Sequence, residues 1–152
     1  MKKGFTLLEM LIATTVMSFG IVAIYGLVVH SIEITSENNN KFIVSQLARE
    51  GLEMVRNLRD QNWLAGDTYN QDLLSCSLGC EIDYNAESLS PDSDSFLKID
   101  SKGFYNYQTG EESIFKRKIV ITQETDFLDI KVSVLWLDNA STTVAENLYD
   151  WR

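Results

Sequence analysis

The feature that most constrains this chain is an uncharged apolar run close to its N-terminus. The run extends from Met10 to Val29 and contains no Asp, Glu, Lys or Arg. As a helix it would be about 30 Å long, which matches the hydrocarbon core of a bilayer. Lys2 and Lys3 stand just before it, and positive charge there holds the leading end on the cytoplasmic side. We therefore predict a single-pass membrane protein with its N-terminus cytoplasmic and its C-terminal domain extracytoplasmic.

Length and charge limit what the rest of the chain can be. A chain of 152 residues has room for the apolar segment and one modest globular domain. The formal net charge is -9, from 13 Lys and Arg against 22 Asp and Glu. This balance argues against a broad phosphate-neutralising surface, so the sequence gives no sign of a nucleic-acid partner.

Two residues at the start of the run do not fit an ordinary signal anchor or secretory signal peptide. Glu9 is a carboxylate among apolar residues, and its transfer into lipid costs about 2.5 kcal/mol or more unless it is paired. Gly4 places a small residue before the apolar run, whereas a secretory cleavage site lies after it. A cut between Gly4 and Phe5 would create an ammonium group about one helical turn from Glu9. That spacing suits pairing between adjacent subunits.

These residues carry a resemblance to a known family. The segment KKGFTLLEMLIA resembles the prepilin signature of type IV pilins. The resemblance implies that a prepilin peptidase removes residues 1–4 by cutting after Gly4, and that the new N-terminus at Phe5 is methylated. It also implies that Glu9 neutralises the Phe5 amine of a neighbouring subunit during assembly. Loss of Lys2 and Lys3 with the leader changes the formal side-chain charge from -9 to -11.

The resemblance also implies partners and a location. The partners are the prepilin peptidase/N-methyltransferase, other pilin subunits, an inner-membrane assembly platform, and membrane lipid before assembly. The chain would then leave the membrane for a cell-surface filament or a periplasmic pseudopilus.

A second apolar pattern follows the polar segment SIEITSENNN. Its apolar residues recur at intervals of three and four, which marks one face of a helix. They are Val44, Leu47, Ala48, Gly51, Leu52, Val55 and Leu58. We predict that residues 31–62 continue the membrane helix of residues 5–30 as an amphipathic helix, with its weakest point at Asn38–Asn40.

Residues 63–152 are predicted to form the globular domain. Its first part, residues 66–95, is rich in turn-forming and acidic residues and is predicted to be irregular. Cys76 and Cys80 lie there, and the sequence leaves open a local disulfide or two free thiols. Asp92 and Asp94 lack the glycine and distal glutamate of a calcium loop, so we predict a solvated loop, no metal site and no cofactor.

The last part, residues 96–152, has the character of an antiparallel sheet. Strands are predicted at Phe96–Ile99, Phe104–Tyr107, Ile114–Gln123, Phe127–Leu137 and Thr142–Tyr149, with a hairpin turn at residues 138–140. In the fourth strand every second residue is apolar, which predicts one buried face: Leu128, Ile130, Val132, Val134 and Trp136. The helix and the sheet each have an apolar face that must be buried. We therefore predict an α+β fold in which the helix packs on the sheet, as in pilins.

The sequence favours a structural role over catalysis. It has no G-x-S-x-G, no phosphate loop and only one histidine, so we expect no enzyme activity. Looser resemblances at residues 48–59, 115–117 and 134–136 and at Trp151–Arg152 are to PilV-like minor pilins. The absence of proline from the helix weakly favours a minor pilin or pseudopilin. The alternatives are a pseudopilin of a type II secretion or DNA-uptake apparatus, and a membrane-anchored binding protein that never polymerises.

Overall fold

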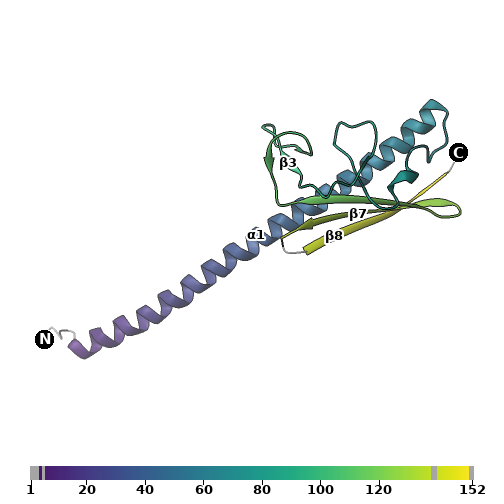
Figure 1. The fold of residues 1–152 in the computed structure, drawn as a ribbon. Helices are drawn as coiled ribbons and strands as arrows, with labels where there is room; N and C mark the ends of the chain where they lie inside the picture. The colour runs from purple at the N-terminus through teal and green to yellow at the C-terminus, as the bar shows by residue number, and fades with distance from the viewer. Residues whose placement is uncertain (1–3, 5, 138–139, 151–152) are drawn as a thin grey trace. The chain divides into compact units, whose positions relative to one another are not determined.

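The computed structural model describes residues 4, 6–137 and 140–150. Most of the predicted leader (residues 1–3), Phe5, most of the predicted turn (residues 138–139) and residues 151–152 lie outside this range. The chain divides into two compact units, Met1–Asn39 and Asn40–Arg152. Helix α1 (Leu7–Ala65) runs through both (Figure 1). The prediction of a single long N-terminal helix is therefore confirmed, and residues 38–40, its predicted weak point, are helical at the boundary between the units.

The end of α1 is set by a glycine. Gly66 has a φ of 85°, in the left-handed region that favours glycine. Its N–H donates to the Trp63 carbonyl (3.2 Å), and the Asp67 N–H donates to the Asn62 carbonyl (2.9 Å). This pair of bonds is the Schellman arrangement, and it satisfies carbonyls that the last turn of a helix leaves free.

The second unit contains a five-stranded antiparallel sheet in the order β2-β1-β6-β7-β8. Its strands are β1 (Cys80–Glu81), β2 (Ser90–Pro91), β6 (Lys116–Gln123), β7 (Phe127–Trp136) and β8 (Ala140–Tyr149). The three long strands confirm the predicted C-terminal sheet. The predicted irregular region contributes the 3-10 helix η1 (Leu74–Cys76) and also two short strands of this sheet, which the sequence did not predict.

A second, three-stranded antiparallel sheet has the order β4-β3-β5. Its strands are β3 (Lys98–Ile99), β4 (Tyr105–Asn106) and β5 (Glu111–Glu112). The prediction of one continuous sheet is thus wrong at this point, since the first two predicted strands form a separate small sheet. β3 and β4 lie within the two predicted segments, but two residues show too little alternation to indicate which sheet a strand joins.

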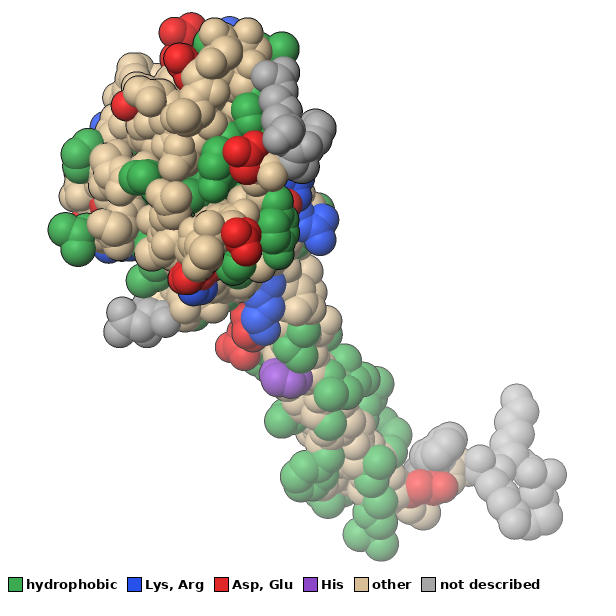
Figure 2. Space-filling view, turned by 90° about the vertical axis from the view of Figure 1, so that its right-hand side faces the viewer, with side chains coloured by type: hydrophobic (Ala, Val, Ile, Leu, Met, Phe, Trp, Pro, Cys, Tyr) green, Lys and Arg blue, Asp and Glu red, His purple; other side chains and the backbone are tan. Residues whose placement is uncertain are grey.

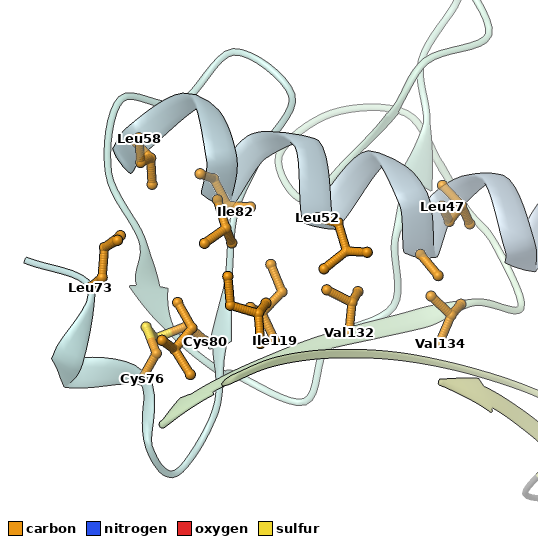
Figure 3. Packing of buried hydrophobic residues seen from close by; sticks show 14 of the residues in the cluster. Leu47, Leu52, Leu58, Leu73, Cys76, Cys80, Ile82, Ile119, Val132 and Val134 are labelled. Atoms are coloured by element: carbon orange, nitrogen blue, oxygen red, sulfur yellow. A yellow bond between two sulfur atoms is a disulfide. The ribbon is translucent and has the colours of Figure 1, made fainter. Parts of the chain in front are cut away.

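The core lies between the second half of α1 and the five-stranded sheet (Figure 3). The predicted helical stripe is buried throughout, and so are all five residues predicted on the inner face of β7. Burial of each large aliphatic side chain stabilises the fold by about 1.5–3 kcal/mol. A Cβ added at Gly51 would lie 2.8 Å from Cγ1 of Val132, so this glycine lets helix and sheet approach closely.

A buried arginine also joins the helix to the sheet. Arg117 lies on β6 and is 1% exposed. Its guanidinium donates to the carbonyls of Leu47 on α1 (3.3 Å) and Ile82 beside β1 (2.6 Å), and lies 3.3 Å from the Glu50 carboxylate. Its own carbonyl accepts a hydrogen bond from the Tyr107 hydroxyl (3.0 Å). A charged side chain thus replaces an aliphatic one at an inward position and ties α1, β6 and the preceding loop together.

Candidate processing and assembly segment

The candidate functional segment is the first half of α1. Beyond Glu9 it carries no charge as far as Val29, and its large apolar side chains are exposed in this subunit, with Leu7 at 85% and Phe19 at 73%. Figure 2 shows hydrophobic side chains along it. Among the described residues, α1 is the one helix long and apolar enough to cross a membrane, and its most apolar window has no buried residue. So large an apolar surface needs a cover from lipid or from other proteins.

Three hydroxyl side chains inside the segment form hydrogen bonds within the helix. The hydroxyl groups of Thr14 and Thr15 donate to the Leu11 carbonyl (3.0 and 2.7 Å), and that of Ser18 donates to the Thr14 carbonyl (2.7 Å). In hydrocarbon no water is available to accept these protons, so internal bonds of this kind lower the cost of insertion. The segment is therefore compatible with an apolar environment along its length.

The segment begins with a helix cap. The hydroxyl of Thr6 accepts a hydrogen bond from the Glu9 N–H (3.3 Å), and its carbonyl accepts one from Met10 (3.2 Å). Thr-x-x-Glu is the sequence pattern of a capping box, so the start of this helix is also marked in the sequence by Thr6 and Glu9. The Glu9 side chain is exposed and forms no ion pair with any residue in the described part of the chain. Its carboxylate thus remains accessible to a cation from outside the subunit.

The predicted processing site lies just before this cap. Gly4 is exposed and precedes the helix, while Phe5 is outside the described residues. A Cβ added at Gly4 would meet nothing within 4 Å. Crowding by described residues therefore does not explain a glycine at this position.

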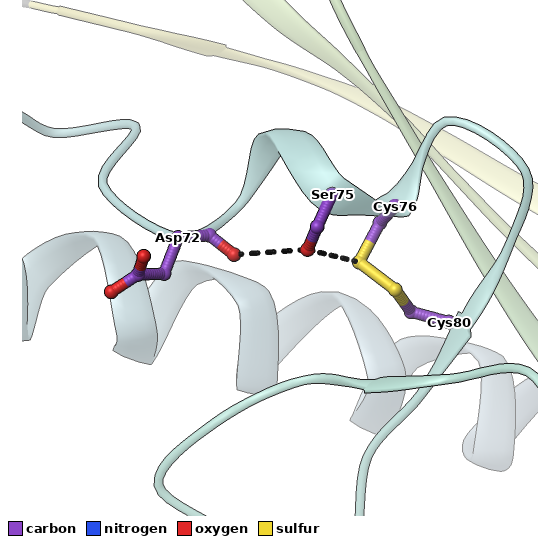
Figure 4. Close-up of a disulfide and its surroundings, with 4 residues drawn as sticks. All are labelled: Asp72, Ser75, Cys76 and Cys80. Carbon is purple, nitrogen blue, oxygen red and sulfur yellow. Dashed lines mark hydrogen bonds between the residues drawn. A yellow bond between two sulfur atoms is a disulfide. The ribbon is translucent and has the colours of Figure 1, made fainter.

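The predicted pair of cysteines is joined in the structure. Cys76 and Cys80 form a disulfide with a Cα–Cα distance of 5.2 Å (Figure 4). Cys76 is completely buried and Cys80 is 3% exposed. The bond connects η1 to β1 inside the core, and the Ser75 hydroxyl lies 3.9 Å from the Cys76 sulfur. Burial keeps reductants away from these sulfurs in the folded chain, which suits a structural bond.

The acidic loop that follows is tied to the sheet. Asp92 pairs with Lys118 (3.0 Å) and Asp94 with Lys116 (2.8 Å), both from β6. These two ion pairs anchor the predicted solvated loop to the sheet. The Asp92 side chain is only 17% exposed, so it is mostly shielded from solvent. Among the described residues no three His, Cys, Asp or Glu side chains are grouped as a metal site requires.

Comparison with known proteins gives one match. Residues 1–25 match the family described as the prokaryotic N-terminal methylation motif. No curated protein and no solved structure matches the chain at a significant level. The matched residues contain Gly4, Phe5 and Glu9 and most of the exposed apolar segment. With the long apolar helix and the antiparallel sheets that follow it, this match supports a type IV pilin-like prepilin.

Proposed function

We propose that this chain is a structural, minor-pilin-like subunit of a type IV pilus or a related filament, and not an enzyme. It enters the membrane through α1 with its N-terminus in the cytoplasm and its globular domain outside. A prepilin peptidase then cuts after Gly4 and methylates Phe5. The observation that carries this proposal is the methylation motif at residues 1–25 on a helix whose apolar side chains are exposed.

The exposed segment suggests how assembly is driven. In the membrane lipid covers the apolar side chains between Met10 and Val29. In a filament the same side chains pack against the helices of neighbouring subunits, so contact with protein replaces contact with lipid and the apolar surface stays out of water. The membrane serves as the reservoir of subunits, and an inner-membrane platform moves them into the filament.

Glu9 supplies the selective contact in this proposal. A carboxylate in hydrocarbon costs about 2.5–3.5 kcal/mol, and pairing with the Phe5 ammonium of an adjacent subunit offsets that cost. The exposed Glu9 side chain, without a cation among the described residues of its own subunit, supports a pairing between subunits. Its backbone N–H is already bonded to Thr6, so replacement of the side chain leaves this cap in place.

The test compares two carboxylates of the same helix, one just before the apolar run and one past its end. Glu9→Leu and Glu9→Gln remove the charge at the start of the segment, whereas Glu33→Gln removes one past its end. We expect all three chains to lose residues 1–4, and only the two Glu9 variants to be missing from sheared filaments on immunoblots. Incorporation of Glu9→Leu at the level of the unmodified chain would show that the assigned role is wrong.

Two other functions fit the same segment. A pseudopilin of a type II secretion or DNA-uptake apparatus uses the same leader and helix, and would be recovered in the periplasm but not in surface filaments. A membrane-anchored binding protein that does not polymerise would stay in the membrane fraction and form no cross-links to other subunits. Fractionation of cells with an active assembly system separates the three.

A further inference from the structure

The last strand of the large sheet is an open edge. β8 pairs with β7 along its whole length, from Trp136↔Ala140 to Phe127↔Tyr149. In the described part of the chain no strand lies on the other side of β8. Alternate residues of such a strand direct their N–H and C=O groups away from the sheet, so β8 presents a row of backbone donors and acceptors without a partner strand.

At the opposite edge of the same sheet, the sequence of β2 prevents another strand from adding. β2 has only two residues, and one of them, Pro91, has no N–H to donate. By contrast β8 has ten residues, with no proline, glycine, lysine or arginine among them. Short length and proline are devices that prevent strands from adding to an edge, and β8 has neither.

β8 is also held firmly and is electrically neutral. Its one charged residue, Glu146, accepts a hydrogen bond from Nε of Arg56 (3.0 Å) and pairs with the same guanidinium through its second oxygen. Leu148, on the same face as Glu146, is 3% exposed, and on the other face the hydroxyls of Thr143 and Ser133 lie 2.8 Å apart. The edge is therefore ordered before any partner arrives, which lowers the cost of binding. On a chain of net charge -9 it offers a strip that does not repel an acidic protein.

We infer that the β8 edge accepts an extended strand from a different subunit of the same filament, which continues the five-stranded sheet. The inference rests on the proposed function. Main-chain hydrogen bonds supply the recognition, and the side chains of Thr143, Ala145 and Asn147 on the exposed face set the register.

A second copy of this chain fits the edge less well. Its described short strands, β1 to β5, have two residues each, and β7 is paired on both sides. β6 has eight residues and pairs with β7 on one side and with β1 at Ile119 on the other. Only its own β8 has ten residues without a partner strand on one side, so only β8 could meet this edge over its full length. Pairing of β8 with β8 is the same patch against itself, which closes as a two-fold dimer. A filament grows instead through unlike patches, so we assign the strand to a different subunit.

The experiment uses the full chain in cells with its own assembly system. Consecutive residues of a strand direct their N–H groups to opposite sides, so one of Val144→Pro and Ala145→Pro removes a bond to β7 and the other removes only an edge donor. Thermal unfolding of the two purified chains identifies the edge variant as the one whose melting temperature stays close to that of the unmodified chain. Val144→Thr and Ala145→Ser keep the N–H and serve as matched controls.

We expect the edge proline to lower the amount of the chain in purified filaments by about tenfold, while its control assembles normally. A photoreactive phenylalanine analogue at Asn147 should cross-link to an extended segment of another protein that carries a prepilin leader. Normal assembly of the edge variant, or a cross-link to β8 of a second copy, would overturn the inference. Absence of the unmodified chain from filaments would instead overturn the proposed function, and the inference with it.

Discussion

At the scale of single residues, the hydrogen bond from the Tyr107 hydroxyl to the Arg117 carbonyl makes the stability of the fold depend on pH. Burial raises the pKa of the Tyr107 hydroxyl to about 12. The unfolded chain ionises its tyrosines near about pH 10, so the unfolded state loses this proton first as the pH rises. The stability that depends on the neutral hydroxyl is therefore present below about pH 10 and is lost as the pH rises towards 12.

Tyr107→Phe tests this contact. It removes the hydrogen bond to the Arg117 carbonyl, so we expect the free energy of unfolding at pH 7 to fall by about 1 kcal/mol. The same change should flatten the loss of stability between about pH 10 and 12. Denaturant unfolding of the full chain in micelles, followed by tryptophan fluorescence, measures both. Tyr84→Phe, at a half-exposed ring, is the control, and an unchanged alkaline slope in Tyr107→Phe would contradict the account.

How far single residues could be predicted from the sequence depended on the signal that each carried. Alternation along residues 128–136 identified every inward side chain of β7, because that strand is long and uniformly apolar on one face. The burial of Arg117 was not predicted, because an arginine in a strand normally points to solvent. Only the backbone carbonyls that its guanidinium contacts in the folded chain explain its burial. The burial of Arg59 was not predicted for the same reason. Its guanidinium lies over the Trp63 ring at 4.5 Å and pairs with Asp60.

At the scale of elements, the packing of α1 on the sheet depends on Gly51. Gly51→Ala gains helix propensity of about 1 kcal/mol, but its Cβ would lie 2.8 Å from Cγ1 of Val132, and overpacking costs about 1–3 kcal/mol. We expect a net destabilisation of about 1 kcal/mol in the full chain. In a Val132→Ala background, where that contact is absent, the same change should be neutral or stabilising. Additive effects in this double-mutant cycle would contradict the proposed close approach.

Among the elements, the long ones could be predicted from the sequence and the arrangement of the short strands could not. Helix α1 and strand β7 were predicted because each repeats its apolar pattern over ten residues or more. β6 was predicted from its β-branched residues, and β8 from the turn that follows β7. β3 and β4 lie within the predicted strands Phe96–Ile99 and Phe104–Tyr107, but the separate sheet that they form with β5 was not predicted. The strands β1, β2 and β5 were not predicted either. Each of these strands has two residues and is defined by its partners, as where Cys80 of β1 pairs with Ile119. Such strands depend on contacts between distant parts of the chain, which a local pattern does not encode.

At the scale of the whole molecule, the two units have different requirements. The second unit covers its own core with helix and sheet and leaves one open strand, β8. The first unit leaves its apolar side chains exposed and its one embedded carboxylate, Glu9, without a cation among the described residues. A chain built in this way completes its burial in a membrane or in an assembly. The candidate segment could be predicted from its sequence because its chemistry lies in consecutive residues, whereas the burial of Arg117 and the pairing of β1 depend on contacts between distant parts of the chain.

The central claim is that the chain follows the prepilin route, and mass spectrometry of its N-terminus after coexpression with a prepilin peptidase tests it most directly. We predict a mature chain that starts at Phe5 and carries one N-methyl group. Gly4→Val should block the cut, whereas Gly20→Ala, at a glycine of α1 with equally open surroundings, should not. An intact leader on the unmodified chain, or a cut after the apolar run, would contradict the account.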